Sequence, residues 1–149
     1  MKISCKAQYA VRLMLHLAGT RGQGYVLLRE IAYAEHISEK FLGQIVMPLR
    51  RRGLLRAGRG AHGGYALAKE PREISVEDIV EAVEGVIALA ERPRRPDATR
   101  ASARCVNQHV WQRVSRAIRR ELAAITLDKL WRLQKHFRDD PDAAIEYSI

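Results

Sequence analysis

The sequence predicts a mainly α-helical fold with one small β hairpin, in which a compact N-terminal part is followed by a long helix. Apolar residues recur at three- and four-residue steps over most of the chain, which is the spacing of helices with one buried side. One glycine-rich segment separates two short runs that alternate like strands. The chain has 149 residues, 47% of them hydrophobic, which is enough for a solid core.

The first element is expected to be a helix that begins after Ser4 and runs to about Ala18. Ser4 is a suitable N-cap because its hydroxyl can accept a hydrogen bond from a free N–H of the first turn. A secretory signal peptide is disfavoured, since Arg12 and His16 interrupt the apolar stretch. The cations expected on the outer side of this helix, where they could contact phosphate, are Lys2, Lys6 and Arg12.

Two short helices joined by a tight turn are predicted for about residues 28–52. His36 and Ile37 lie between the two helices and leave room only for a turn. Ser38 is a good N-cap for the second helix, and Glu39 lies in its first turn, where the helix dipole favours an acid. The predicted buried stripe of the second helix is Phe41, Leu42, Ile45, Val46 and Leu49.

Pro48 lies inside the pattern of the second helix. It lacks a backbone donor and clashes with the carbonyl of Gln44, four residues earlier. The helix is therefore expected to kink just beyond the base-reading turns. The alternative is that it ends at Pro48 and that a separate turn carries Arg50, Arg51 and Arg52. Gly53 is expected to end the helical region.

A β hairpin is predicted for about residues 54–68, with strands at Leu54–Ala57 and Tyr65–Ala68. Helix, turn, helix and hairpin in this order predict a winged helix-turn-helix domain, which we place at residues 1–85. In such a domain the second helix of the motif enters the major groove of DNA, and the first crosses the backbone. The glycines expected to form the turn of the wing are Gly58, Gly60, Gly63 and Gly64.

The distribution of charge agrees with a nucleic-acid partner. Residues 1–69 hold 12 Lys and Arg against 3 Asp and Glu, whereas residues 70–149 hold 14 of each sign. All of the formal net charge of +9 therefore lies on the part predicted to meet phosphate. The alternative is a merely basic, solvated surface.

The second half begins with a capping-box pattern, Ser75 with Asp78, which predicts a helix from Val76 to about Glu84. Residues 86–104 lack periodicity and contain two prolines and five arginines, so they are predicted to form a flexible loop. Residues 105–136 are predicted to form a dimerisation helix and a C-terminal helix capped by Thr126. Residues 137–149 are predicted to be a frayed, acidic tail.

The long helix carries an apolar stripe that a single helix cannot bury by itself. Packing against a second copy of the chain would bury it, and a two-fold dimer suits a protein that reads two DNA half-sites. The alternative is that the stripe packs on the first helix of its own chain. The residues predicted to mediate dimerisation are Trp111, Val114, Ile118 and Leu122.

The candidate base-reading residues are Lys40 and Gln44, one turn apart at the start of the second helix of the motif. Gln can bond adenine through two contacts, and Lys can reach guanine. Arg59, beside His62 at the tip of the wing, is suited to insertion into a narrow minor groove. The complete set of predicted DNA-binding residues is Lys6, Ser38, Lys40, Phe41, Gln44, Arg50, Arg51, Arg59 and His62.

Other classes of protein are disfavoured. The five histidines are scattered and no Ser/His/Asp or Cys/His motif occurs, so we expect no enzyme. Only 6% of the residues are aromatic, which disfavours RNA binding by stacking. No apolar run reaches the length of a membrane span, and two cysteines fit the reducing cytoplasm. A winged domain that binds only protein remains the alternative function.

Several motifs together resemble the Rrf-two family of bacterial transcription regulators. They are Lys6-Ala7-x-Tyr9-Ala10-Val11, Ile37-Ser38-x-x-Phe41-Leu42-x-Gln44, Leu49-Arg50-x-x-Gly53-Leu54, the wing Arg59-Gly60-x-x-Gly63-Gly64-Tyr65-x-Leu67, and Trp111 at the start of the long helix. The resemblance extends to about residue 133 and implies a homodimeric, DNA-binding repressor whose long helix crosses that of its partner.

Many members of that family hold a 2Fe–2S cluster through three cysteines before the long helix. Here only Cys105 matches, and the histidine expected three residues later is replaced by Gln108, with His109 displaced by one. No metal or cofactor is therefore expected, and Cys105 with His109 is the alternative site for a cluster or zinc. In this respect the chain resembles the clusterless CymR branch, which implies that DNA affinity is modulated by a protein partner such as a metabolic enzyme. A small-molecule effector or thiol oxidation of Cys105 is the alternative signal.

Overall fold

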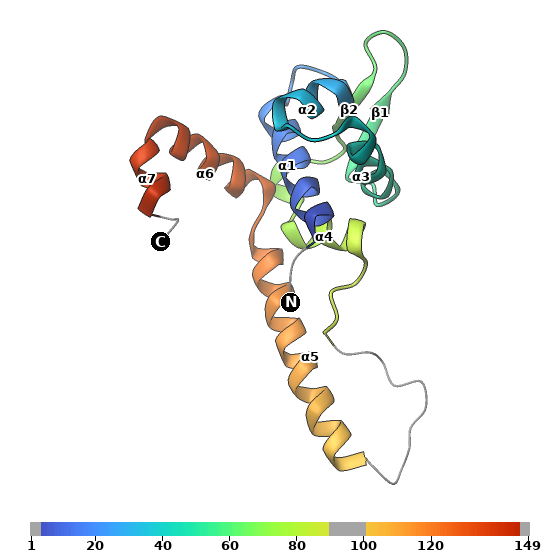
Figure 1. Cartoon of the computed structure of the whole chain (residues 1–149), viewed down its shortest axis with the longest axis vertical. Coiled ribbons are helices and arrows are strands. Elements are labelled where there is room, and N and C mark those ends of the chain that lie inside the picture. Colours follow the sequence, from blue (N-terminus) through green and yellow to red (C-terminus); the bar gives the residue numbers. More distant parts are fainter. Residues whose placement is uncertain (1–3, 90–100, 147–149) are drawn as a thin grey trace.

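The computed structural model describes residues 4–89 and 101–146 and consists mainly of helices with one two-stranded hairpin (Figure 1). This confirms the predicted fold class. The elements in chain order are α1 (Cys5–Gly19), α2 (Leu28–Glu35), α3 (Glu39–Arg51), β1 (Leu55–Gly58), β2 (Gly64–Leu67), the 3-10 helix η1 (Pro71–Glu73), α4 (Val76–Glu84), α5 (Ala101–Ala124), α6 (Leu127–Asp139) and α7 (Pro141–Glu146).

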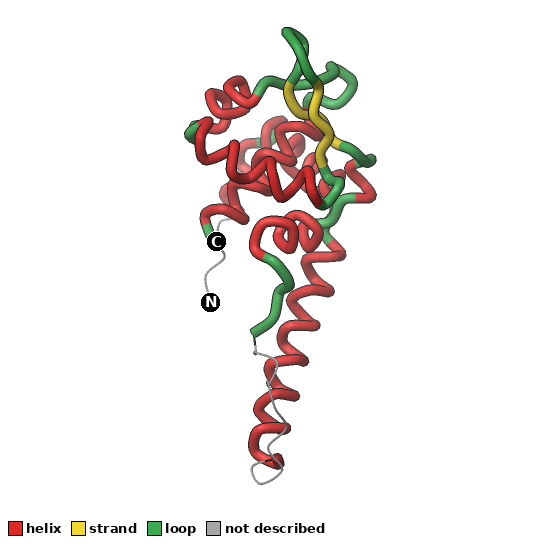
Figure 2. The backbone as a smooth tube through the Cα atoms, turned by 90° about the vertical axis from the view of Figure 1, so that its right-hand side faces the viewer, coloured by secondary structure: helices red, strands yellow, loops and turns green. Residues whose placement is uncertain are grey.

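Helices α1 to α4 and the hairpin surround a hydrophobic core, to which α6 contributes the fully buried Leu127 (Figures 1 and 2). We call α1 to α4 together with the hairpin the winged domain. As predicted, Ser4 caps α1 by accepting a hydrogen bond from the N–H of Ala7. Leu13 and Met14 of α1, Ile31 of α2 and Leu42 of α3 are fully buried in this core. The apolar stripes of these helices therefore meet at the centre of the winged domain.

Helix α3 continues through Pro48 to Arg51, so the interpretation in which the helix ends at Pro48 is wrong. The proline removes only one backbone donor, and the buried Ile45 and Leu49 on either side of it still hold the helix against the core. Gly53, with φ of 70°, donates its N–H to the carbonyl of Arg50 and ends the helical region.

The hairpin pairs Leu55 with Leu67 and Gly58 with Gly64 in antiparallel register. Each strand thus lies one residue closer to the tip of the wing than predicted, because the N–H of Leu54 still bonds to the carbonyl of Leu49 in α3. The chain before α2 pairs with β2 through two bonds between Val26 and Tyr65, of 2.9 and 2.8 Å. Gly64 is required there, since a Cβ atom would lie 2.2 Å from the carbonyl oxygen of Val26.

Helix α4 begins with the predicted capping box of Ser75 and Asp78. Helix α5 begins at Ala101, so the predicted loop is too long by residues 101–104. Residues 90–100 of that loop lie outside the described part of the chain. Figure 1 shows α5 extending away from the winged domain. Residues 86–89 run beside α5, where the hydroxyl of the buried Ser115 accepts a hydrogen bond of 2.9 Å from the N–H of Leu89.

The end of α5 is joined to the winged domain by ion pairs. Arg119 lies 2.7 Å from Glu77 and 3.3 Å from Glu81, both on α4. The hydrogen bond with Glu77, and then the charges of Glu81 and Glu77, raise the pKa of the Arg119 guanidinium, which is ionised in any case. The direction of α5 is therefore fixed at its C-terminal end.

Helix α6 begins at the predicted cap, Thr126, and continues to Asp139, and α7 covers Pro141–Glu146. The prediction of a frayed tail from residue 137 is therefore wrong for these residues. Asp140 accepts a hydrogen bond of 3.4 Å from the N–H of Ala143, and a proline opens α7, so the acidic residues form a helix start.

Candidate nucleic-acid interface

The polar face of α3 is exposed at its N-terminal end. Lys40 and Gln44, the predicted base-reading residues, both lie on this surface. Ser38 is the N-cap, and its hydroxyl accepts a hydrogen bond of 3.1 Å from the N–H of Phe41. The opposite side of the helix is buried, so α3 can present its polar side to a ligand while it remains attached to the core.

Phe41 is half-buried and does not share the exposed face. Its ring meets that of Tyr9 of α1 edge to face, with the ring centres 5.7 Å apart. This contact attaches the first turn of α3 to α1. Phe41 is predicted above to contact DNA, but its position favours a role in holding α3.

Lys6 and Arg12 of α1 are engaged within the protein. The ammonium of Lys6 donates a hydrogen bond of 3.0 Å to the carbonyl of Val83 near the end of α4. The guanidinium of Arg12 pairs with Glu35, 3.1 Å away. The sequence did not indicate these contacts, and neither cation is included in the interface proposed below. Lys2 lies outside the described residues.

The other predicted cations lie at the end of α3 and on the wing. Arg50, Arg51, Arg59 and His62 are exposed, and within residues 4–89 and 101–146 none of them forms an ion pair. Arg52 differs, since it lies 3.6 Å from Glu81. The uncompensated cations thus lie in the last turn of α3 and in the turn between β1 and β2.

Arg29 is a candidate that the sequence reasoning missed. It lies exposed in the first turn of α2, directly after the segment that pairs with β2. The first helix of a helix-turn-helix motif crosses the DNA backbone, so a cation at its start is suited to a phosphate. The signal in the sequence is its position at the start of the first helix of the motif.

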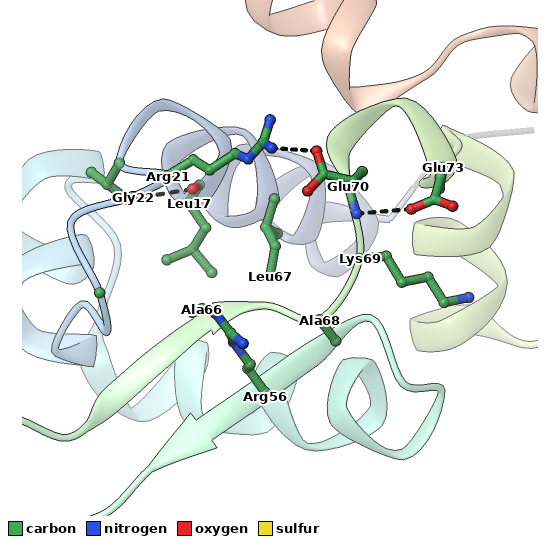
Figure 3. Close-up of a pocket in the computed structure, with 12 residues that line it drawn as sticks. Leu17, Arg21, Gly22, Arg56, Ala66, Leu67, Ala68, Lys69, Glu70 and Glu73 are labelled. Atoms are coloured by element: carbon green, nitrogen blue, oxygen red, sulfur yellow. Dashed lines mark hydrogen bonds and ion pairs between the residues drawn. The ribbon is translucent and has the colours of Figure 1, made fainter.

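A hollow of about 490 Å³ lies between the hairpin, the loop after α1 and η1 (Figure 3). On its rim Arg21 pairs with Glu70, and the N–H of Glu70 donates a hydrogen bond of 3.1 Å to the carboxylate of Glu73. The hydroxyl of Thr20 donates to carbonyls of α1. These side chains offer no nucleophile with an adjacent base, and the prediction that the chain is not an enzyme stays a prediction.

One face of α5 is apolar and exposed. Its residues Val106, Val110, Trp111 and Val114 are 38–66% exposed, and we call them the apolar face of α5. Ile118 and Leu122, closer to the winged domain, are half-buried. Because the apolar face of α5 is exposed, it does not pack on α1 in this structure, as the alternative would require.

The residues present do not fit a conventional iron–sulfur cluster. Such a cluster needs several thiolates, and the chain has only Cys5 and Cys105. Among the described side chains no group of three or more His, Cys, Asp or Glu could hold a metal ion. His109 is exposed on α5, and the side chain of Cys105 lies outside the described set. None of the helices in the described residues is long and apolar enough to cross a membrane.

The fold and the exposed basic surface define a winged helix-turn-helix protein of the kind that binds DNA. The chain belongs to the Rrf2 (Rrf-two) family, which is described as an iron-dependent transcriptional regulator. The family matches residues 3–132 of the chain. The chain is therefore a DNA-binding transcriptional regulator, as predicted.

Similar transcriptional regulators support this assignment. The chain is 36% identical over 130 residues to the HTH-type transcriptional regulator CymR of Bacillus subtilis, which covers 87% of this chain and 89% of that protein. It is 35% identical over 130 residues to the regulator IscR of Pectobacterium atrosepticum, with 87% and 79% covered.

Solved structures agree with the sequence comparison. The structure of CymR, the global cysteine regulator of B. subtilis, has a TM-score of 0.72 and 34% identity, and covers 89% of this chain and 98% of that one. The structure of T. potens IscR has a TM-score of 0.70 and 34% identity, with 94% and 91% covered.

Proposed function

We propose that the protein is a cytoplasmic, homodimeric repressor that covers a promoter by placing α3 of each subunit in the major groove. In this proposal Lys40 and Gln44 contact base edges, and Ser38 contacts a base or phosphate. Arg59 and His62 bring the wing to the minor groove. The phosphate contacts are assigned to Arg29, Arg50 and Arg51.

The observation that carries the proposal is the exposed polar face of α3, together with exposed cations at the end of α3 and on the wing that have no acidic partner in the described residues. An excess of positive charge costs free energy through self-repulsion unless a partner neutralises it. All of the net charge of +9 belongs to the part of the chain that contains α3 and the wing. A duplex with its phosphate backbone supplies the matching charge.

The apolar face of α5 supports a homodimer. Trp111 is 42% exposed and Val106 66% exposed, on a helix that projects from the winged domain (Figure 2). A second α5 offers the same face and would bury both at once, which is the symmetric arrangement of most homodimers. Two winged domains joined in this way would reach two half-sites of one duplex.

In this proposal, DNA affinity is controlled by a partner other than a conventional iron–sulfur cluster. The donor set argues for this, because one chain supplies only two thiols and these lie far apart in sequence, at Cys5 and Cys105. A metabolic enzyme or a small-molecule effector is proposed instead. The alternative is a zinc ion or cluster shared between two copies of Cys105 and His109.

The salt dependence of DNA affinity tests the proposed function. Binding to a random duplex should weaken steeply between low and high salt, because phosphate contacts release counterions. A flat response would favour the protein-interaction module instead. Iron and zinc analysis of anaerobically purified protein decides the alternative at Cys105 and His109: metal at near-stoichiometric amounts would contradict the clusterless assignment.

A further inference from the structure

The turn between α2 and α3 is held from outside by α1. Glu35 is the last residue of α2, and His36 follows in the left-handed region with φ of 53°. Only His36 and Ile37 separate Glu35 from Ser38, the N-cap of α3. The direction in which α3 leaves the turn therefore depends on how the end of α2 is fixed.

Two residues of α1 fix Glu35 through three contacts. The Nε atom of Arg12 donates a hydrogen bond of 3.1 Å to Oε2 of Glu35, and a terminal nitrogen of Arg12 donates 2.5 Å to its backbone carbonyl. The Nδ1 atom of His16 lies 3.1 Å from the other carboxylate oxygen. The side chains of Glu35 and His16 are each only 20% exposed.

The same face of α1 also holds the start of α3. The guanidinium of Arg12 lies over the ring of Tyr9, 5.6 Å from its centre, and Tyr9 meets Phe41 edge to face. Tyr9, Arg12 and His16 follow one another at helical steps of three and four residues. One face of α1 thus contacts both sides of the helix-turn-helix turn.

The position of Glu35 is unfavourable for α2 taken alone. The C-terminus of a helix carries a partial negative charge, so an acid there is destabilising. The last carbonyls of a helix also lack partners within it. Arg12 compensates for the unfavourable charge and for the missing carbonyl partner, because it binds both the carboxylate and the backbone carbonyl of Glu35. The contacts with α1 therefore account for an acid that the local helix does not favour.

We propose that Glu35 is a positioning residue for DNA recognition, which Arg12 and His16 hold so that α3 meets the major groove at a fixed angle. This rests on the proposed role of α3 in the groove. Glu35 itself does not contact DNA in this proposal. Its loss lowers affinity for the correct duplex through misdirection of α3.

The test compares Glu35→Gln with Asp128→Asn. Each change removes one negative charge, and Asp128 pairs with Arg132 on α6, 2.9 Å away and outside the helix-turn-helix. The duplex is one enriched from a random pool by the wild-type protein, and a scrambled duplex of equal length serves for non-specific binding. Charge alone predicts slightly tighter binding of both variants to both duplexes.

A positioning role of Glu35 predicts weaker, not tighter, binding of Glu35→Gln, and only to the enriched duplex. Glu35→Gln should bind the enriched duplex about tenfold more weakly than the wild type, since residues in one hydrogen-bonded network couple at this scale. Its binding to the scrambled duplex should be unchanged or tighter, and Asp128→Asn should bind the enriched duplex as tightly as the wild type or slightly more tightly. Equal or tighter binding of Glu35→Gln to the enriched duplex would overturn the proposal.

Arg12→Lys provides a second variant that keeps the charge but loses the two-point contact. It should weaken binding to the enriched duplex. The double variant of Arg12→Lys and Glu35→Gln should bind this duplex no more weakly than the single variant with the lower affinity. Fully additive losses would overturn the proposal. Circular dichroism at the assay temperature verifies that each variant is folded. If the wild type enriches no duplex, the proposed function fails. If the wild type enriches a duplex and the variants bind it as tightly as the wild type does, the positioning role alone fails.

Discussion

The winged domain and helix α5 use similar apolar residues in opposite ways. In the winged domain Leu42 and Leu49 of α3 are fully buried, and the helix presents only its polar face to solvent. On α5, Val110 and Trp111 remain 47% and 42% exposed, and the helix meets the rest of the chain mainly at its C-terminal end. One region is complete in a single chain, and the other has an apolar surface without a cover in the described residues.

This difference separates the folding of one chain from the association of two chains. Burial within the winged domain stabilises the fold of one chain, since the free energy gained is proportional to the apolar area removed from water. The apolar face of α5 gains this free energy only on association. The same type of substitution should therefore act on stability in one region and on oligomeric state in the other.

The largest effect is expected for Leu42→Ala. Leu42 is fully buried, and its truncation leaves a cavity that the surrounding helices cannot fill, at a cost of about 2–5 kcal/mol. Urea denaturation followed by circular dichroism measures the loss in free energy of unfolding. A loss below about 1 kcal/mol would mean that the core around α3 is loosely packed.

Val114→Asp should break the dimer and leave the winged domain folded. An unpaired carboxylate in the buried interface should raise the dissociation constant of the dimer roughly a hundredfold, or about 3 kcal/mol. Sedimentation equilibrium measures the constant, and the same change at the exposed Ala123 of α5 is the control. A dimer of unchanged strength would assign the interface to another surface.

Gln44→Ala should lower affinity for the correct site by about 1–3 kcal/mol and relax one base position. Fluorescence anisotropy with a set of single-base variants of the enriched duplex measures both. Gln112→Ala, at an exposed position of α5, is the matched control and should bind like the wild type. A loss that is uniform across unrelated sequences would assign Gln44 to the DNA backbone instead.

The smallest effects compare two helix caps. Ser38 and Ser75 both accept a hydrogen bond of 3.1 Å from the N–H three residues on, so each change to Ala should cost about 1 kcal/mol of stability. Only Ser38 lies on the proposed interface. Thermal unfolding should therefore show similar losses, whereas anisotropy should show weaker DNA binding for Ser38→Ala alone. Equal DNA affinities would remove Ser38 from the interface.

The elements with strong local signals were predictable from sequence. Caps at Ser4, Ser38, Ser75 and Thr126 marked the starts of four helices, because a hydroxyl cap acts through a nearby N–H. The start of α5 and the helical tail lacked such a signal, and acidic residues after α6 suggested disorder where Asp140 begins α7.

The site was less predictable than the fold. Exposure of Lys40 and Gln44 followed from the helical pattern, since polar residues opposite a buried stripe face outward. The partners of Lys6 and Arg12 did not, because Val83 and Glu35 lie far from them in sequence. Pairing of long side chains depends on how the helices pack, which sequence spacing alone does not encode.

Hydroxyl-radical footprinting on the enriched duplex tests most directly whether two winged domains joined by α5 read two half-sites. The dimer predicts two protected segments of inverted sequence, with centres separated by a whole number of helical turns of about 10 base pairs. A single protected segment without inverted symmetry, at protein concentrations that saturate the duplex, would contradict it.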